Sequence, residues 1–131
     1  MSAAPRKRRH FLHGATLKDP AILPLSQWSS ANYGFYIAFR DWLFATGYSD
    51  VSIKLYGVAV RQVIGFLQKP YWSIDPDADL ERAWQYIQSR PIASSTLSDY
   101  HKGVFKLGDY LRLRLHRPRK EKQPNLEYYF A

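Results

Sequence analysis

The sequence predicts an all-α protein, a compact four-helix bundle with flexible basic segments at both ends. Apolar residues recur at helical spacing in four segments, residues 30–46, 50–68, 77–89 and 95–114. Serine or aspartate stands at the start of each segment, and glycine or an X-Pro pair follows the first three. With 46% hydrophobic and 16% aromatic residues, the 131-residue chain has enough apolar material for the core of one domain.

The first helix is expected over residues 30–46, with an apolar face formed by Tyr36, Phe39 and Leu43. Ser29 or Ser30 is the expected N-cap, because a serine hydroxyl accepts a hydrogen bond from an otherwise unpaired amide of the first turn. Gly47 is expected to end the helix, since glycine readily takes the left-handed conformation that follows a last turn.

The second helix is expected over residues 50–68. Ser49 is its expected N-cap, and Asp50 places negative charge at the end of the helix dipole that favours it. The pair Lys69-Pro70 ends the segment, because a residue that precedes proline avoids the helical region.

Two further helices complete the expected bundle. Residues 71–76 are typical of a turn. Residues 77–89 predict a short third helix, because its acidic first turn suits the dipole and it has an apolar stripe of Leu80, Ala83, Trp84 and Ile87. Arg90-Pro91 ends it. The fourth helix is expected over residues 95–114, with Ser94 or Ser95 as its cap.

Residues 52–67 and 96–111 form an internal repeat. Tyr56 aligns with Tyr100, Val60 with Val104, and Leu67 with Leu111, whereas most residues between these positions differ. At 100° per residue the shared positions fall on one helix face. They are Ile53, Tyr56, Val60, Val63 and Leu67 in one copy, and Leu97, Tyr100, Val104, Leu107 and Leu111 in the other. We expect them to be the buried stripes of the second and fourth helices.

The opposite faces of these two helices carry cations, Lys54 and Arg61 in the second, and Lys102 and Lys106 in the fourth. One interpretation is an ordinary solvated face. The other, which we favour, is that the apolar sides meet and the four cations point outward together as one cradle for a polyanion.

Two glycines lie within the second helix, Gly57 on its flank and Gly65 on its cationic face. Glycine inside a helix costs about 1 kcal/mol relative to alanine. We therefore expect the close approach of either another helix or a DNA backbone.

The charge distribution favours a nucleic-acid partner. The formal net charge is +8 and the isoelectric point is about 9.8. The excess lies in both end segments and in both copies of the repeat, whereas residues 71–93 carry a net −2. This acidic segment is expected to face away from a bound polyanion.

Three parts are expected along the chain: a basic flexible arm over residues 1–29, the four-helix domain over 30–115, and a linker or tail over 116–131. The absence of cysteine excludes disulfides and thiolate metal sites. No apolar run approaches the roughly 18 residues of a membrane span, and no apolar stretch of a secretory signal follows the basic start. We expect a cytoplasmic location, no membrane partner and no small-molecule substrate.

Several short motifs in residues 30–115 occur in the order found in one protein family. Residues 39–67 read FRDWLFATGYSDVSIKLYGVAVRQVIGFL and contain Trp42-Leu43, the turn Gly47-Tyr48-Ser49, and a helix start with Ser52-Ile53 and Tyr56. Residues 94–114 open similarly, with Thr96-Leu97 and Tyr100. This region resembles the N-terminal core-binding domain of tyrosine recombinases, the phage-integrase family.

The resemblance implies a SAM-like orthogonal bundle that packs on one side of duplex DNA, with its second and fourth helices nearest the major groove. It implies the non-catalytic half of a protein of DNA integration and site-specific recombination, with other recombinase protomers on the DNA as further partners. The implied phosphate contacts are Lys54, Arg61, Lys102 and Lys106. Where the linker leaves, Arg112, Arg114, Arg117, Arg119 and Lys120 are expected to cross the DNA backbone. Such contacts position a protein but do not read sequence.

No catalytic residue is expected in this chain. The family's reaction needs a tyrosine nucleophile with arginine, lysine and histidine partners, which lie in a separate catalytic domain. His116 and Arg119 match an H-x-x-R motif of that domain, but Pro118 interrupts it and Tyr128 follows too soon. His10 and His13 lack the further ligands that zinc requires, so no metal or other cofactor is expected.

Three alternatives remain open. A helical protein–protein interaction module would use the aromatic residues Tyr48, Tyr71 and Trp72 as a partner patch. A small enzyme would use the H-x-x-R motif and the terminal tyrosines. An RNA-binding protein would need an aromatic platform that cannot be assigned from the sequence.

Overall fold

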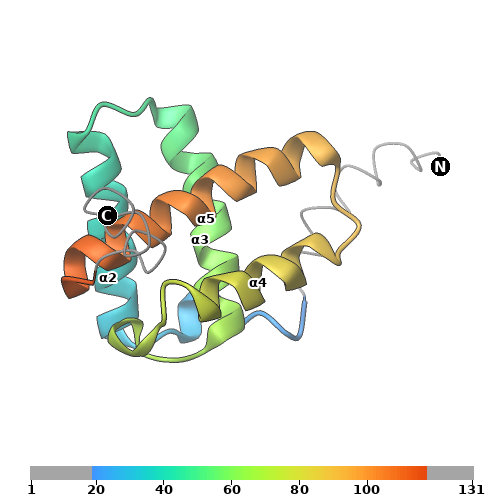
Figure 1. Ribbon diagram of the computed structural model, residues 1–131, viewed down its shortest axis with the longest axis horizontal. Coiled ribbons are helices and arrows are strands. Elements are labelled where there is room, and N and C mark those ends of the chain that lie inside the picture. Colours follow the sequence, from blue (N-terminus) through green and yellow to red (C-terminus); the bar gives the residue numbers. More distant parts are fainter. Residues whose placement is uncertain (1–18, 118–131) are drawn as a thin grey trace, which may run out of the picture.

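The computed structural model describes residues 19–117, and within this range the regular secondary structure is entirely helical. Four α-helices pack as a bundle (Figure 1): α2 (Ser30–Ala45), α3 (Asp50–Leu67), α4 (Ala78–Gln88) and α5 (Ser94–Leu115). Two short 3-10 turns accompany them, η1 (Leu25–Gln27) and η2 (Tyr71–Ser73). Each helix end lies within one residue of its predicted position, which confirms the all-α four-helix architecture. Residues 1–18 of the expected flexible arm and residues 118–131 of the expected tail lie outside the described residues.

Helix α3 lies at the centre of the bundle and contacts α2, α4 and α5. The repeat is confirmed as a pair of buried stripes, although Tyr56 and Leu97 are only partly buried. Helix α5 crosses over α3 (Figure 1). Gly103 of α5 packs there against Tyr56 and Ala59 of α3. A Cβ atom on Gly103 would lie 2.9 Å from the Ala59 Cβ and 3.1 Å from the Tyr56 Cα. The absence of a side chain at Gly103 therefore sets how closely α5 approaches α3.

Two of the three predicted serine caps are confirmed. The Ser29 hydroxyl accepts a hydrogen bond from the Asn32 amide, and the Ser49 hydroxyl accepts one from the Ser52 amide, each at 3.2 Å. The prediction for α5 was wrong, because Ala93 is its N-cap and Ser94 is already helical. At the end of α2, Gly47 has a φ of +98° and its amide donates to the Phe44 carbonyl, as expected of a glycine terminator.

Residues 19–29, which we call the strap, belong to the segment expected to be a flexible arm, but they pack against α3. The Leu23 amide donates to the Gly65 carbonyl at 2.9 Å, and the Trp28 indole donates to the Leu23 carbonyl at 3.0 Å. The Asp19 carboxylate contacts the Tyr86 hydroxyl and lies 3.2 Å from the Arg90 guanidinium. The strap is therefore tied to both α3 and α4.

The two glycines of α3 have different neighbours. A Cβ atom on Gly65 would lie 2.7 Å from both the Leu23 carbonyl oxygen and the Ile22 Cγ2. The close approach at Gly65 is therefore made by the strap, and neither of the expected partners, a helix or a DNA backbone, occupies the site. A Cβ atom on Gly57 would lie 3.1 Å from the Tyr36 hydroxyl of α2, so a neighbouring helix accounts for Gly57.

We predict that Gly65→Ala destabilises the protein by about 1–3 kcal/mol, because the new methyl group collides with strap backbone. The matched control is Gly34→Ala in α2, where a Cβ atom meets nothing within 4 Å and alanine should stabilise the helix by up to about 1 kcal/mol. Urea denaturation of both variants measures the difference. Equal unfolding free energies for the two variants would contradict the packing of the strap on α3.

Candidate nucleic-acid interface

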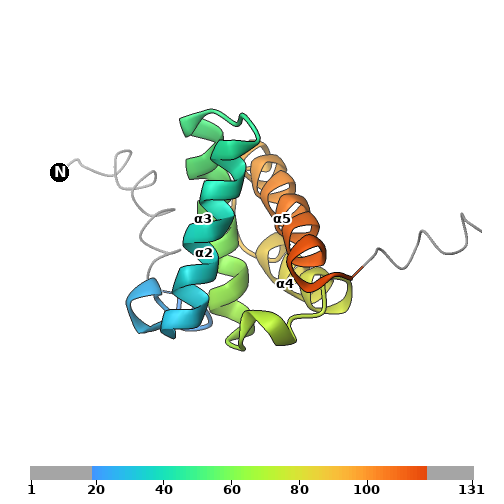
Figure 2. The same ribbon diagram turned by 90° about the vertical axis from the view of Figure 1, so that its left-hand side faces the viewer.

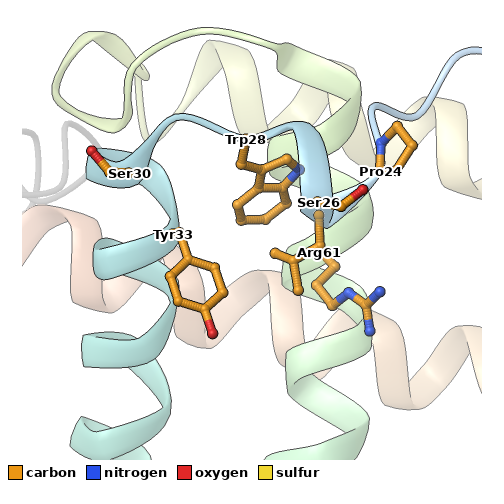
Figure 3. A pocket seen from close by; sticks show the side chains of 7 residues that line it. Pro24, Ser26, Trp28, Ser30, Tyr33 and Arg61 are labelled. Atoms are coloured by element: carbon orange, nitrogen blue, oxygen red, sulfur yellow. The ribbon is translucent and has the colours of Figure 1, made fainter.

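The cations of α3 lie on the face that carries the strap. Lys54, Arg61 and Gly65 are spaced by seven and four residues, so they share one side of the helix. Lys54 is exposed, whereas Arg61 is partly buried. Arg61 lines an open hollow with Pro24, Leu25, Ser26, Trp28, Ser30 and Tyr33. Figure 3 shows Arg61 on α3 below η1, with Tyr33 projecting from α2 on the other side of the hollow.

The cations of α5 lie on the other side of α3. Gly103 contacts Tyr56 and Ala59, which point away from the strap. Lys102 and Lys106, on the same helix as Gly103, therefore lie on the side of α3 opposite to the strap. In Figure 2 the strap, drawn in blue, and α5 flank α3 from opposite directions. The predicted single cradle of four cations is therefore wrong. Helical periodicity places residues around one helix axis, but it does not determine how two helices are rotated relative to each other.

Two of the four carboxylates of residues 71–93, Asp77 and Asp79, form internal ion pairs. Asp79 lies 2.8 Å from the Lys69 ammonium and 3.6 Å from the Arg82 guanidinium. Burial alone would raise the pKa of Asp79, but the hydrogen bonds from Lys69 and from the Asp75 amide outweigh burial and lower it. Asp77 pairs with Arg112 at 2.8 Å. Much of the negative charge of this segment is therefore neutralised within the fold.

Arg112 is one of the predicted phosphate contacts, but its side chain has structural partners. One terminal nitrogen donates to the Asp77 carboxylate at 2.8 Å and to the Pro76 carbonyl at 3.1 Å. The side chain is 13% exposed. A phosphate would have to displace these partners, so we do not include Arg112 in the interface.

The remaining predicted cations lie at the carboxyl end of α5 or beyond it. Arg114 is exposed and donates to the Tyr110 hydroxyl at 3.0 Å. Arg117 is exposed, and its amide donates to the Arg112 carbonyl at 2.8 Å. Arg119 and Lys120 lie outside the described residues, as do Tyr128 and the histidine pair His10 and His13.

The face where α5 crosses the amino-terminal half of α3 brings together the groups best suited to phosphates. We call it the crossing face, formed by Lys102, Lys106, Tyr48, Ser49, Ser52 and Tyr56. The Lys106 ammonium lies 5.2 Å from the centre of the Tyr48 ring, which in turn contacts the Tyr56 ring at 5.8 Å. The interaction with Tyr48 raises the pKa of Lys106, despite partial burial, which means that the surroundings favour the charged ammonium.

Two further features shape the electrostatics of the crossing face. The start of α3, capped by Ser49, contributes the positive end of a helix dipole, which attracts anions. The Asp109 carboxylate acts in the opposite sense, because its charge contributes to the raised pKa of Lys106. Tyr48 appeared in the sequence only as a candidate aromatic for a partner patch, and its role as a support for Lys106 could not be seen there.

Among residues 19–117, no group of three or more histidine or acidic side chains could hold a metal ion. No helix in this range is long and apolar enough to cross a membrane. Comparison of the chain with known protein families, curated proteins and solved structures finds no match. The interface is therefore argued only from the geometry and charge of the residues described above.

We predict that Arg112→Ala lowers the free energy of unfolding by about 1–3 kcal/mol, because it leaves the Asp77 carboxylate and the Pro76 carbonyl without a buried donor. Lys102→Ala is the matched control on the same helix. Lys102 is exposed and makes no ion pair within residues 19–117, so its removal should change stability by at most about 0.5 kcal/mol. Thermal or urea unfolding compares them, and an unchanged stability of Arg112→Ala would show that the residue is available to a ligand.

Proposed function

We propose that the chain binds duplex DNA through the crossing face, as the non-catalytic DNA-binding domain of a tyrosine-recombinase-like protein that acts in DNA integration and site-specific recombination. The observation that carries the proposal is the separation of paired from unpaired cations. Lys69, Arg82, Arg90 and Arg112 are held in ion pairs by Asp19, Asp77 and Asp79. Lys102 is exposed and has no such partner in the described part of the chain, and it lies one helical turn from the partly buried Lys106.

The end segments add to this binding. Residues 19–117 carry eleven basic and nine acidic side chains, so most of the net +8 belongs to the ends of the chain. Arg6, Lys7, Arg8 and Arg9 form one basic run, and Arg117, Arg119 and Lys120 form another. Basic residues at the ends of a domain can contact phosphates on either side of a groove-facing surface and raise the affinity without reading sequence.

The motif order described for residues 30–115 supports the same proposal, because it implies that the second and fourth helices approach the duplex. The crossing face is formed by these two helices, α3 and α5. It differs from the initial expectation in its membership, since Lys54 and Arg61 lie on the strap side of α3. Side-chain hydroxyls of Ser49 and Ser52 complete a polar surface suited to phosphate and sugar contacts.

A protein partner is the second candidate function. It is favoured by Phe44 and Val51, which are 70% and 69% exposed and border the turn between α2 and α3. Large apolar side chains at such exposure are common on interaction surfaces. A partner bound there would not depend on the charge of Lys102.

We predict that Lys102→Glu weakens duplex binding on the order of tenfold. A unit charge 4 Å from a phosphate is worth about 1 kcal/mol in water, and the reversal changes the charge by two. Lys54→Glu is the matched control, because it makes the same change at another exposed lysine, on the strap side of α3. Fluorescence anisotropy with a labelled duplex measures both. If Lys54→Glu is the more damaging change, the duplex lies on the strap side and the crossing face is wrong.

We also predict a steep salt dependence. If about five phosphates are neutralised, log K should fall with log salt at a slope near −4 to −5. Replacing Arg6, Lys7, Arg8 and Arg9 with glutamine should make the slope shallower by about 0.9 for each phosphate that is no longer neutralised, with helix content unchanged. Titrations at several salt concentrations give both slopes, and a flat dependence for the unaltered protein would exclude phosphate-driven binding.

A further inference from the structure

Helices α2 and α5 meet through aromatic side chains. The Tyr110 ring of α5 lies 5.1 Å from Trp42, 5.4 Å from Phe35 and 5.8 Å from Phe39, all of α2. We call this line of contact, with Tyr48 at one end and Tyr71 and Trp72 at the other, the aromatic seam. The rings of Phe35, Phe39 and Tyr110 beneath the seam are buried.

Two cations of α5 lie along the seam. Lys106, Tyr110 and Arg114 are spaced by four residues and form one ridge of the helix. Eight residues separate the two cations, which corresponds to about 12 Å along the helix axis. This span is a few times the axial rise of about 3.4 Å per nucleotide of one strand, so a strand of several nucleotides is long enough to reach both cations.

Arg114 is held in place by the rings around it. Its guanidinium carbon lies 5.2 Å from the centre of the Tyr71 ring, 5.7 Å from that of Phe35 and 5.8 Å from that of Tyr110. Only one of its terminal nitrogens donates, to the Tyr110 hydroxyl, and no carboxylate pairs with it within residues 19–117. The guanidinium is thus positioned in advance, with donors left for an anion.

Aromatic surface is available at both ends of the seam. Trp72 is 54% exposed and meets the edge of the Tyr71 ring at 5.2 Å. At the other end, a hollow of about 250 Å³ is lined by Trp42, Thr46, Gly47, Tyr48 and Lys106. Each end therefore combines a cation with an aromatic ring, a combination that accepts a phosphate and a stacked base.

We propose that the aromatic seam binds a short unpaired strand of nucleic acid, with phosphates on Lys106 and Arg114 and bases stacked on Trp72 and in the hollow beside Trp42. The inference goes beyond duplex binding and rests on the proposed function only through Lys106, which belongs to both surfaces. Two cations spaced along a row of aromatic rings suit a nucleic-acid strand, because its phosphates repeat along the backbone and its bases are planar. A protein partner would not require that repeat.

The test uses the full chain and compares a short labelled oligo-dT, the same length of oligo-rU, and a DNA duplex. We expect Trp72→Ala and Arg114→Gln each to weaken oligo-dT or oligo-rU binding at least about fivefold. Trp72→Ala should leave duplex binding within about twofold. Trp72→Phe, which keeps a ring, should retain most of the affinity. The two oligonucleotides distinguish unpaired DNA from unpaired RNA.

The matched controls are Arg40→Gln and Tyr33→Ala. Arg40 also lies over a tyrosine ring, 5.7 Å from the centre of Tyr36, and Tyr33 is also an exposed ring, but both lie away from the seam. Neither should alter oligonucleotide binding, and circular dichroism should show all variants folded.

Three outcomes would overturn the inference. The unaltered protein could show no detectable oligonucleotide binding. Alternatively, Trp72→Ala and Arg114→Gln could both leave oligonucleotide binding unchanged. Trp72→Ala could instead abolish self-association in size-exclusion chromatography while leaving oligonucleotide binding intact, which would assign the seam to a protein contact. Failure of the duplex proposal is distinguishable, because the unaltered protein would then bind oligo-dT or oligo-rU but not the duplex.

Discussion

The close crossing of α3 and α5 at Gly103 is the constraint on which the rest of this structure depends. With no side chain at that position, the α5 backbone comes within contact distance of Tyr56 and Ala59. This approach allows Val60, Val63, Leu107 and Leu111 to be fully buried between the two helices. The same crossing fixes the rotation of α5, so it also decides that Lys102 and Lys106 emerge next to Tyr48 and the start of α3.

The distribution of charge follows from this packing. Asp77 and Asp79 pair with Arg112 of α5 and with Lys69, which follows α3. Asp19 of the strap pairs with Arg90, which follows α4. Each of these pairs joins two different segments of the fold. Removing one partner of such a pair leaves a poorly solvated charge, so these cations are committed to the fold. Cations outside these ion pairs are then the ones available to a ligand, and two of those on α5, Lys106 and Arg114, lie against aromatic rings.

Both sides of α3 are covered, by α5 on one and by the strap on the other. The strap explains why a basic face read from the sequence is less accessible than expected, since Arg61 is partly enclosed beside η1. Asp19 connects the strap to α4. Burial raises the pKa of Asp19, but its contacts with Tyr86, the Ala21 amide and Arg90 outweigh burial and lower the pKa, which favours the charged carboxylate. The consequence for function is that the strap encloses Arg61, whereas Lys54 on α3 and Lys102 and Arg114 on α5 stay exposed.

The amino-acid sequence by itself determined the four helices, their ends, and the buried stripes. Periodicity, the Ser29 and Ser49 caps and the Gly47 terminator act over a few residues, so they can be read without knowing the fold. The tertiary structure alone decided that Arg112 pairs with Asp77, 35 residues away, and that the strap occupies the space beside Gly65. It also decided that Arg114 rests on Tyr71 and that the four cations divide between two faces. These outcomes depend on the relative rotation of helices, which many packing contacts set together and which the pattern within one helix does not contain.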